Sequence, residues 1–109
     1  MPAARVARNA GAQFEALVAI MQRLRGPKGC PWDRTQTLES LRGFVLEETY
    51  EVLDAIDRGD RAALGNEIGD LLFEGVFLAQ IGADEGAFTV VESLRSITDK
   101  LIRRHPHIF

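Results

Sequence analysis

The sequence predicts an all-α fold, built as a helical bundle of about four helices per protomer that assembles into a dimer or a higher oligomer. Three observations lead to this prediction. Apolar residues recur at intervals of three and four along the chain, and glycines, prolines and capping residues separate these periodic segments. The third segment is apolar almost all round, and a chain of 109 residues can scarcely bury such a helix alone.

The first expected helix runs from about Gln13 to Arg25. It follows an alanine-rich segment over residues 1–12 that shows no clean stripe and is expected to be a loosely ordered lead-in. Residues 26–36 contain two glycines and two prolines, which indicate a structured loop. Residues 13–109 are expected to form a single domain.

The second and third expected helices are joined by a very short turn. Thr37 can cap the second helix, which extends to about Arg58 before Gly59 supplies a C-terminal stop. Asp60 can begin the third helix at once, and that helix runs to about Ile81. The two helices should therefore form a tight antiparallel hairpin.

The fourth expected helix follows a loop at residues 82–87. It opens with a capping box, Thr89 to Glu92, and ends near Arg104. Four apolar side chains of this helix are expected to face the core: Leu94, Ile97, Leu101 and Ile102.

Two acidic pairs lie at helical spacing on the hairpin, Glu48 with Glu51 and Glu67 with Asp70. Residues three apart share a helix face, and both pairs fall within the apolar stripes of their helices. A carboxylate that faces a core must be protonated, paired or bound to a metal. Residues equally far from the turn at Gly59 meet across it, so the hairpin can bring the two pairs together.

A divalent metal site explains these pairs best. No lysine or arginine lies between Glu47 and Asp57, so the second helix cannot neutralise its own charge. Several converging oxygen ligands suit Mg²⁺ or Mn²⁺, which in turn hold polyphosphate oxygens. A single Glu-x-x-Glu is usually a solvated helix face, but two pairs on apolar stripes favour the metal.

The loop at 26–36 and the end of the last helix hold the other candidate residues. Trp32 either anchors the loop by packing or stacks on a nucleobase, with Lys28 near phosphate. Cys30 is a poor nucleophile because no histidine lies near it in the sequence. Three cations gather near the end of the last helix, where they either complement the helix dipole or bind phosphate: Lys100, Arg103 and Arg104. His105 and His107 are expected to be structural.

Composition excludes several other classes of protein. The chain is 46% hydrophobic with a mean hydropathy of −0.06, and neither a bilayer-length apolar run nor a signal peptide is visible. We therefore expect a soluble cytoplasmic protein with no membrane partner. A single cysteine agrees with a reducing compartment. A net charge of −3 argues against binding to nucleic acid.

Several stretches resemble the MazG family of all-α nucleoside triphosphate pyrophosphohydrolases, and in particular its N-terminal MazG domain. The resemblance covers nearly everything from Leu17 onward. It is carried by these stretches: MQRLRGPKGCPWDRTQT, LEETYEVLDAI, EIGDLLFEGVF and ITDKLIRRHPHIF. The family's Glu-Glu-x-x-Glu element followed by Glu-x-x-Asp corresponds here to Glu47, Glu48 and Glu51, then Glu67 and Asp70.

The resemblance implies Mg²⁺-dependent hydrolysis of nucleoside triphosphates to monophosphate and pyrophosphate, which would remove unwanted nucleotides. It also implies that protomers pair as homodimers or larger assemblies. The metal ligands would be the four carboxylates named above: Glu48, Glu51, Glu67 and Asp70. Glu47 would orient or deprotonate the attacking water. Lys100 and Arg103 or Arg104 would balance phosphate charge, with Lys28 as a weaker candidate.

Two features depart from the family pattern. Glu74 stands where relatives often carry an uncharged amide, which allows a further oxygen ligand or a second metal. Longer members continue past HPHIF into a second similar domain, whereas this chain ends at Phe109.

Three alternatives stay open. The first is a non-catalytic helical dimerisation module. The second is a pyrophosphatase whose substrate specificity is limited to one nucleotide, and the third is a redox di-iron bundle. The di-iron bundle is disfavoured because neither histidine forms a Glu-x-x-His pair on a facing helix.

Overall fold

The computed structural model describes the backbone of residues 3–109 and the side chains from Asn9 onward, and this part of the chain is all-α, as predicted. It forms five helices: α1 (Ala3–Arg25), α2 (Pro31–Thr35), α3 (Leu38–Arg58), α4 (Arg61–Asp84) and α5 (Val90–Arg104). None of the described helices is long and apolar enough to cross a bilayer.

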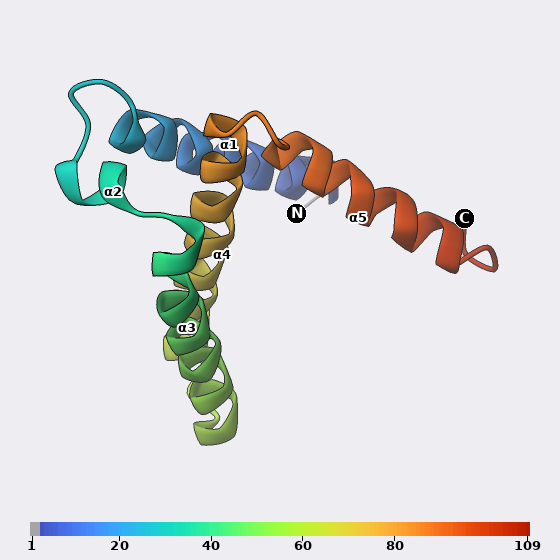
Figure 1. Ribbon diagram of the computed structural model, residues 1–109. Coiled ribbons are helices and arrows are strands. Elements are labelled where there is room, and N and C mark those ends of the chain that lie inside the picture. The colour runs from blue at the N-terminus through green and yellow to red at the C-terminus, as the bar shows by residue number, and fades with distance from the viewer. Residues whose placement is uncertain (1–2) are drawn as a thin grey trace.

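The helices α3 and α4 pack against each other more extensively than any other pair in the described chain, and Figure 1 shows them side by side as a hairpin. Thr37 caps α3 in a reciprocal capping box with Ser40. Gly59 ends α3 in the left-handed conformation at φ 67°, which suits a residue without Cβ. The Asp60 side chain then accepts from the Ala63 N–H and starts α4. The predicted caps and tight turn are thus confirmed.

A small core forms where α1 crosses the end of the hairpin farthest from Gly59 (Figure 1). Met21 of α1, Leu41 of α3 and Phe77 of α4 are fully buried there. Val76 and Ile81 complete the buried cluster. Toward the Gly59 turn the hairpin consists of α3 and α4 alone, so its outer faces stay open.

Several helix boundaries differ from those expected. Helix α1 begins at Ala3 rather than Gln13, because alanine favours helix even where no apolar stripe requires packing. Residues 1 and 2 of the expected lead-in lie outside the described residues. A one-turn helix, α2, forms inside the expected loop, with Pro31 at its favoured first position. Helix α4 extends to Asp84, one turn beyond the expected end.

Helix α5 corrects the expectation that four of its apolar side chains face the core of the protomer. After the turn in which Phe88 packs against Gly82, α5 projects away from the hairpin (Figure 1), and α4 is the one described helix whose backbone it contacts. No residue of α5 is buried. The four side chains expected in the core are 44–47% exposed: Leu94, Ile97, Leu101 and Ile102. The periodicity correctly predicts an apolar face, but this chain alone does not cover it.

Candidate metal centre

The hairpin brings together carboxylates from both of its helices. Glu48 of α3 and Glu67 and Asp70 of α4 each offer an oxygen, and these three oxygens lie within 4.8 Å of one another. The antiparallel pairing of α3 and α4 produces this arrangement, because residues equally far from the Gly59 turn lie opposite each other. Three of the four predicted metal ligands are therefore adjacent.

The fourth predicted ligand, Glu51, joins the cluster through Glu67. A hydrogen bond between these two carboxyl groups is the main cause of a raised pKa at Glu51, and the negative charge of Glu67 adds to it. Glu51 is exposed, so it lies at the solvent side of the cluster. Glu47 is exposed too and lines an open groove of about 460 Å³ on α3 with Tyr50 and Glu51. Its charge still acts on both Glu48 and Glu51.

Glu74 extends the cluster on its inner side. Its side chain lies one turn after Asp70 on α4, and the residue is only 8% exposed. Burial raises the pKa of Glu74, and the charges of Glu48 and Asp70 raise it further.

Three carboxylate oxygens of this cluster are buried without any hydrogen-bond partner: Oε2 of Glu48, Glu67 and Glu74. Burial also raises the pKa of Glu48, and the neighbouring carboxylates Glu51 and Asp70 add to the effect. None of the groups that shift the pKa of Glu48, Glu51 or Glu74 is a cation. Because unpaired buried oxygens are costly, the cluster fits an ion whose ligands are oxygens, such as Mg²⁺ or Mn²⁺.

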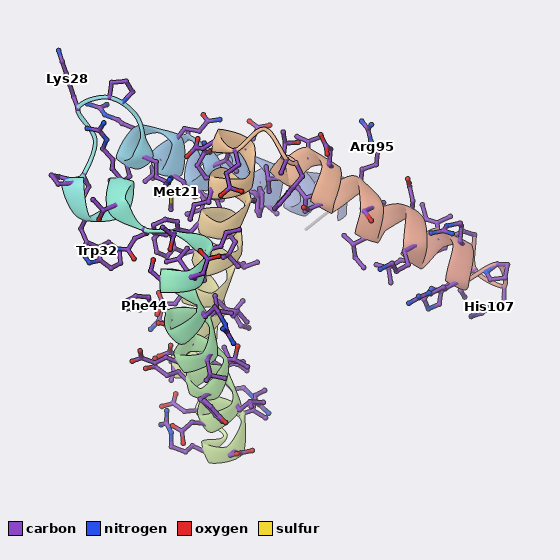
Figure 2. The ribbon with its side chains drawn as sticks, viewed as in Figure 1. Met21, Lys28, Trp32, Phe44, Arg95 and His107 are labelled. Atoms are coloured by element: carbon purple, nitrogen blue, oxygen red, sulfur yellow. The ribbon has the colours of Figure 1, made fainter. Side chains whose placement is uncertain are left out.

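An aromatic cluster lies next to the acidic one. The Trp32 ring meets Phe44 edge to face at 5.6 Å and Phe77 at 6.4 Å. Phe44 precedes Glu48 by one turn of α3, and Phe77 follows Glu74 by one turn of α4. Trp32 keeps 51% of its surface exposed, so it packs on one side and stays open on the other. Figure 2 shows Trp32 and Phe44 on the same flank of the molecule, whereas Lys28 points outward from its loop.

The three cations of α5 do not reach the acidic cluster within one protomer. Lys100, Arg103 and Arg104 lie near the end of a helix that leads away from the hairpin, as the position of His107 in Figure 2 shows. The His105 Nδ1 atom lies 2.6 Å from the Leu101 carbonyl oxygen. This contact within the last turn agrees with a structural role for His105.

Arg25 is a structurally important residue that the sequence did not single out. Its guanidinium is largely buried and pairs with Asp84 at 2.9 Å. It donates to the carbonyl oxygens of Asp33 and Gln36 and lies 5.9 Å from the centre of the Phe77 ring. Through these contacts Arg25, at the end of α1, holds the segment that contains α2 and Trp32 close to α1 and α4. No local pattern predicts these contacts, because the partners are distant in sequence.

The part of the chain that contains the acidic cluster is similar to known proteins. The family model of the MazG nucleotide pyrophosphohydrolase domain matches residues 36–109. The chain belongs to this family. The match begins just before α3 and includes every carboxylate of the cluster, so the MazG resemblance inferred from the motifs is confirmed.

Two relatives show how far the similarity to MazG proteins extends. The nucleoside triphosphate pyrophosphohydrolase/pyrophosphatase MazG of Thermotoga maritima is 50% identical over 102 residues, which are 94% of this chain and 40% of that protein. The nucleoside triphosphate pyrophosphohydrolase of Escherichia coli (strain K12) is 54% identical over 98 residues, which are 89% of this chain and 37% of the relative. The chain thus spans about two fifths of the length of these curated relatives.

A solved structure supports the MazG fold independently. The crystal structure of a mazG-related protein from Thermotoga maritima superposes with a TM-score of 0.75 at 29% identity. The match covers 87% of this chain and 82% of that one. The arrangement of helices described above is therefore that of a known MazG-related protein.

Proposed function

We propose that this domain hydrolyses nucleoside triphosphates, ribo- or deoxy-, to the monophosphate and pyrophosphate in the presence of Mg²⁺, with Mn²⁺ as an alternative ion. One observation carries the proposal. In a MazG-family domain, three carboxylates converge within 4.8 Å, and two of them carry buried oxygens that no protein group satisfies. The removal of unwanted nucleotides in the cytoplasm is the role we infer for this reaction.

The proposed roles of the acidic residues follow from their positions. Glu48, Glu51, Glu67 and Asp70 would hold the ion. Such an ion, when bound, neutralises triphosphate oxygens and makes water more acidic. Glu47 lies at the exposed edge of the cluster, where it can orient a water molecule and accept its proton. No covalent nucleophile is needed.

The aromatic cluster of Trp32, Phe44 and Phe77 offers a binding surface for the nucleobase of the substrate. The exposed side of Trp32 can stack on a nucleobase while Phe44 and Phe77 support the ring from the other side. Phosphates that extend from such a base would run toward the acidic cluster along the hairpin. We propose Lys28 only as a peripheral phosphate contact, because it points away from the cluster in the structure (Figure 2).

The cations of α5 are proposed to act on another copy of the chain. Lys100, Arg103 and Arg104 lie on a helix that leaves its own hairpin, so they serve the site only in a homo-oligomer. The exposed apolar faces of the protomer support such an assembly: Leu46, Tyr50 and Leu53 on α3, and Leu94, Ile97 and Leu101 on α5. A dimer or tetramer would cover these faces.

The test is product analysis on a panel of ribo- and deoxynucleoside triphosphates, with and without Mg²⁺. The proposal predicts monophosphate and pyrophosphate in equal amounts, only with the metal, and loss of both products in Glu48→Gln. Release of orthophosphate would contradict the reaction type. Mg²⁺ binding without turnover of any triphosphate would favour the non-catalytic module instead.

A further inference from the structure

We propose that Arg25 is a positioning residue for substrate binding, which holds Trp32 in the orientation that stacks on a nucleobase. The inference rests on the base-stacking role of Trp32 in the proposed function, and it adds the group that sets the ring in place. Arg25 is the last residue of α1. None of the contacts described for its guanidinium involves a carboxylate of the acidic cluster, so we place its effect on substrate at Trp32.

Arg25 fixes the end of the short helix that carries Trp32. Helix α2 has only five residues, and a helix of one turn leaves the carbonyl groups of its last turn without partners inside the helix. The Arg25 Nη1 atom donates to the Asp33 carbonyl oxygen at 2.6 Å and to the Gln36 carbonyl oxygen at 3.1 Å. A cation at this place satisfies the carbonyls and complements the negative end of the helix. The backbone on the C-terminal side of Trp32 is thereby held against α1.

The same guanidinium also acts on the Trp32 ring, through Phe77. It lies 5.9 Å from the centre of the Phe77 ring, and the Trp32 ring meets that ring edge to face at 6.4 Å. Phe77 is fully buried, so it gives both neighbours a fixed surface. Trp32 is 51% exposed. Contacts on the inner side of Trp32 therefore decide how its exposed face is presented to a base.

Arg25 is itself held in one orientation by α4. Its Nε atom donates to Asp84 Oδ2 at 2.9 Å, and the Gln80 side chain donates to Asp84 Oδ1 at 2.9 Å. The Arg25 side chain is 11% exposed, whereas that of Asp84 is 40% exposed. The planar guanidinium can donate to a carboxylate and to backbone carbonyls at the same time, which the ammonium group of lysine cannot match. Asp84 thus fixes the group that reaches α2.

The experiment measures nucleotide affinity and the motion of the Trp32 ring in folded protein. Trp32 is the single tryptophan of the chain, so the decay of its fluorescence anisotropy reports how freely the ring moves. The probes for affinity are the α,β-methylene analogues of the four common ribonucleoside triphosphates, used with Mg²⁺. A methylene group replaces the bridging oxygen at the bond that the proposed reaction breaks, so Kd is measured by calorimetry without turnover.

Arg25→Ala is expected to loosen the ring and to weaken binding. Because stacking of one base is worth about 1–3 kcal/mol, Kd should rise by at least about fivefold, and KM for triphosphates should change more than kcat. Arg25→Lys keeps the charge without the fork and should recover part of the affinity. Asp84→Ala should shift Kd and ring motion in the same direction by a smaller amount. The exposed Arg23→Ala on the same helix is the matched control and should leave both unchanged.

A double-mutant cycle with Trp32→Ala shows whether Arg25 acts through the ring. If it does, adding Arg25→Ala to Trp32→Ala should change Kd by less than about twofold. An equal rise in Kd in both backgrounds would overturn the inference. An unchanged Kd in folded Arg25→Ala would also overturn it, because a loss of stability alone is what a merely structural arginine predicts. Circular dichroism identifies folded samples, and Asp84→Ala replaces Arg25→Ala in the cycle if the latter does not fold.

The outcomes separate this inference from the proposed function. Product analysis reports hydrolysis of triphosphates whether or not Arg25 sets the ring. A Kd that Trp32→Ala leaves unchanged, or no binding of any of the four analogues, would overturn the inference even if triphosphates are hydrolysed. A Kd that depends on Trp32 and is weakened by Arg25→Ala only when Trp32 is present would uphold it even if no triphosphate is turned over.

Discussion

Glu48 and Asp70 face each other across the α3–α4 hairpin, and together with Glu67 their carboxylate oxygens lie within 4.8 Å. Like charges at this separation repel in the absence of metal. The fold nevertheless keeps them together, because the caps at Thr37, Gly59 and Asp60 and the core around Phe77 fix the two helices. Function and stability therefore oppose each other at this cluster when no metal is bound.

Removal of one ligand should separate activity from folding. Glu48→Gln and Asp70→Asn are each expected to lower turnover by at least about 100-fold, which exceeds what the loss of supporting groups around a metal commonly costs. The metal-free form of each variant should be as stable as the wild-type protein or more stable, because a repulsive charge is gone. Paired kinetic and thermal unfolding measurements check this, with Glu39→Gln as the control. Retained activity in both variants would refute the assigned ligands.

The metal-free protein should lose stability as the pH rises. The pKa values of Glu48, Glu51 and Glu74 are raised in the folded state by burial and by neighbouring carboxylates. Between the ordinary value of 4.5 and the higher folded value, the folded chain binds more protons than the unfolded chain. The stability that these three groups contribute is therefore fully present below pH 4.5 and is lost as the pH rises through their folded pKa values.

The measurement is the unfolding temperature in the presence of a chelator at several pH values from 4.5 upward. Glu74→Gln and Glu48→Gln should each show a shallower decline than the wild-type protein. Asp60 does not affect the stability in this pH range. The hydrogen bond from the Ala63 N–H lowers the pKa of Asp60, so the stability that Asp60 contributes is lost only as the pH falls below 3.8. An equal decline in all three proteins would assign the effect to other groups.

Mg²⁺ should reverse this loss at neutral pH. An ion that binds only the folded state stabilises it by about 2.7 kcal/mol at a concentration of 100 times Kd. We expect the unfolding temperature at pH 7.5 to rise with Mg²⁺ in the wild-type protein and to change little in Glu48→Gln. An equal rise in both proteins would show that the ion binds elsewhere.

Trp32 should affect substrate binding more than the chemical step. Stacking of one base on an aromatic side chain is worth about 1–3 kcal/mol, so Trp32→Ala is expected to raise KM by roughly 5- to 150-fold with a smaller change in kcat. Trp32→Phe should restore part of the binding. Quenching of the fluorescence of the single tryptophan by nucleotide would report the contact independently. An unchanged KM would leave Trp32 as a packing residue only.

Arg25 should be important for stability. Arg25→Ala removes the ion pair with Asp84 and leaves the Asp33 and Gln36 carbonyls without this donor. We expect a loss of about 2–4 kcal/mol in the free energy of unfolding, measured in urea. Arg23→Ala, an exposed change on the same helix, should cost less than about 0.5 kcal/mol. Equal effects of the two changes would contradict the role of Arg25.

The sequence predicts those parts of the structure that depend on local patterns. The caps at Thr37 and Asp60 and the left-handed Gly59 depend on neighbouring residues, so the hairpin and the convergence of Glu48 with Asp70 could be predicted. The direction of α5 could not, because its apolar stripe indicates burial but does not say against what. The same is true of Arg25 and of the meeting of Trp32 with Phe44 and Phe77. These contacts join distant segments, and only the folded chain reveals them.

The most direct test of the central claim follows the phosphorus resonances of a nucleoside triphosphate mixed with the protein and Mg²⁺. We predict that monophosphate and pyrophosphate appear together in equal amounts, and that a chelator or Asp70→Asn stops both. Appearance of nucleoside diphosphate and orthophosphate, or an unchanged triphosphate spectrum with folded, metal-loaded protein, would contradict the account.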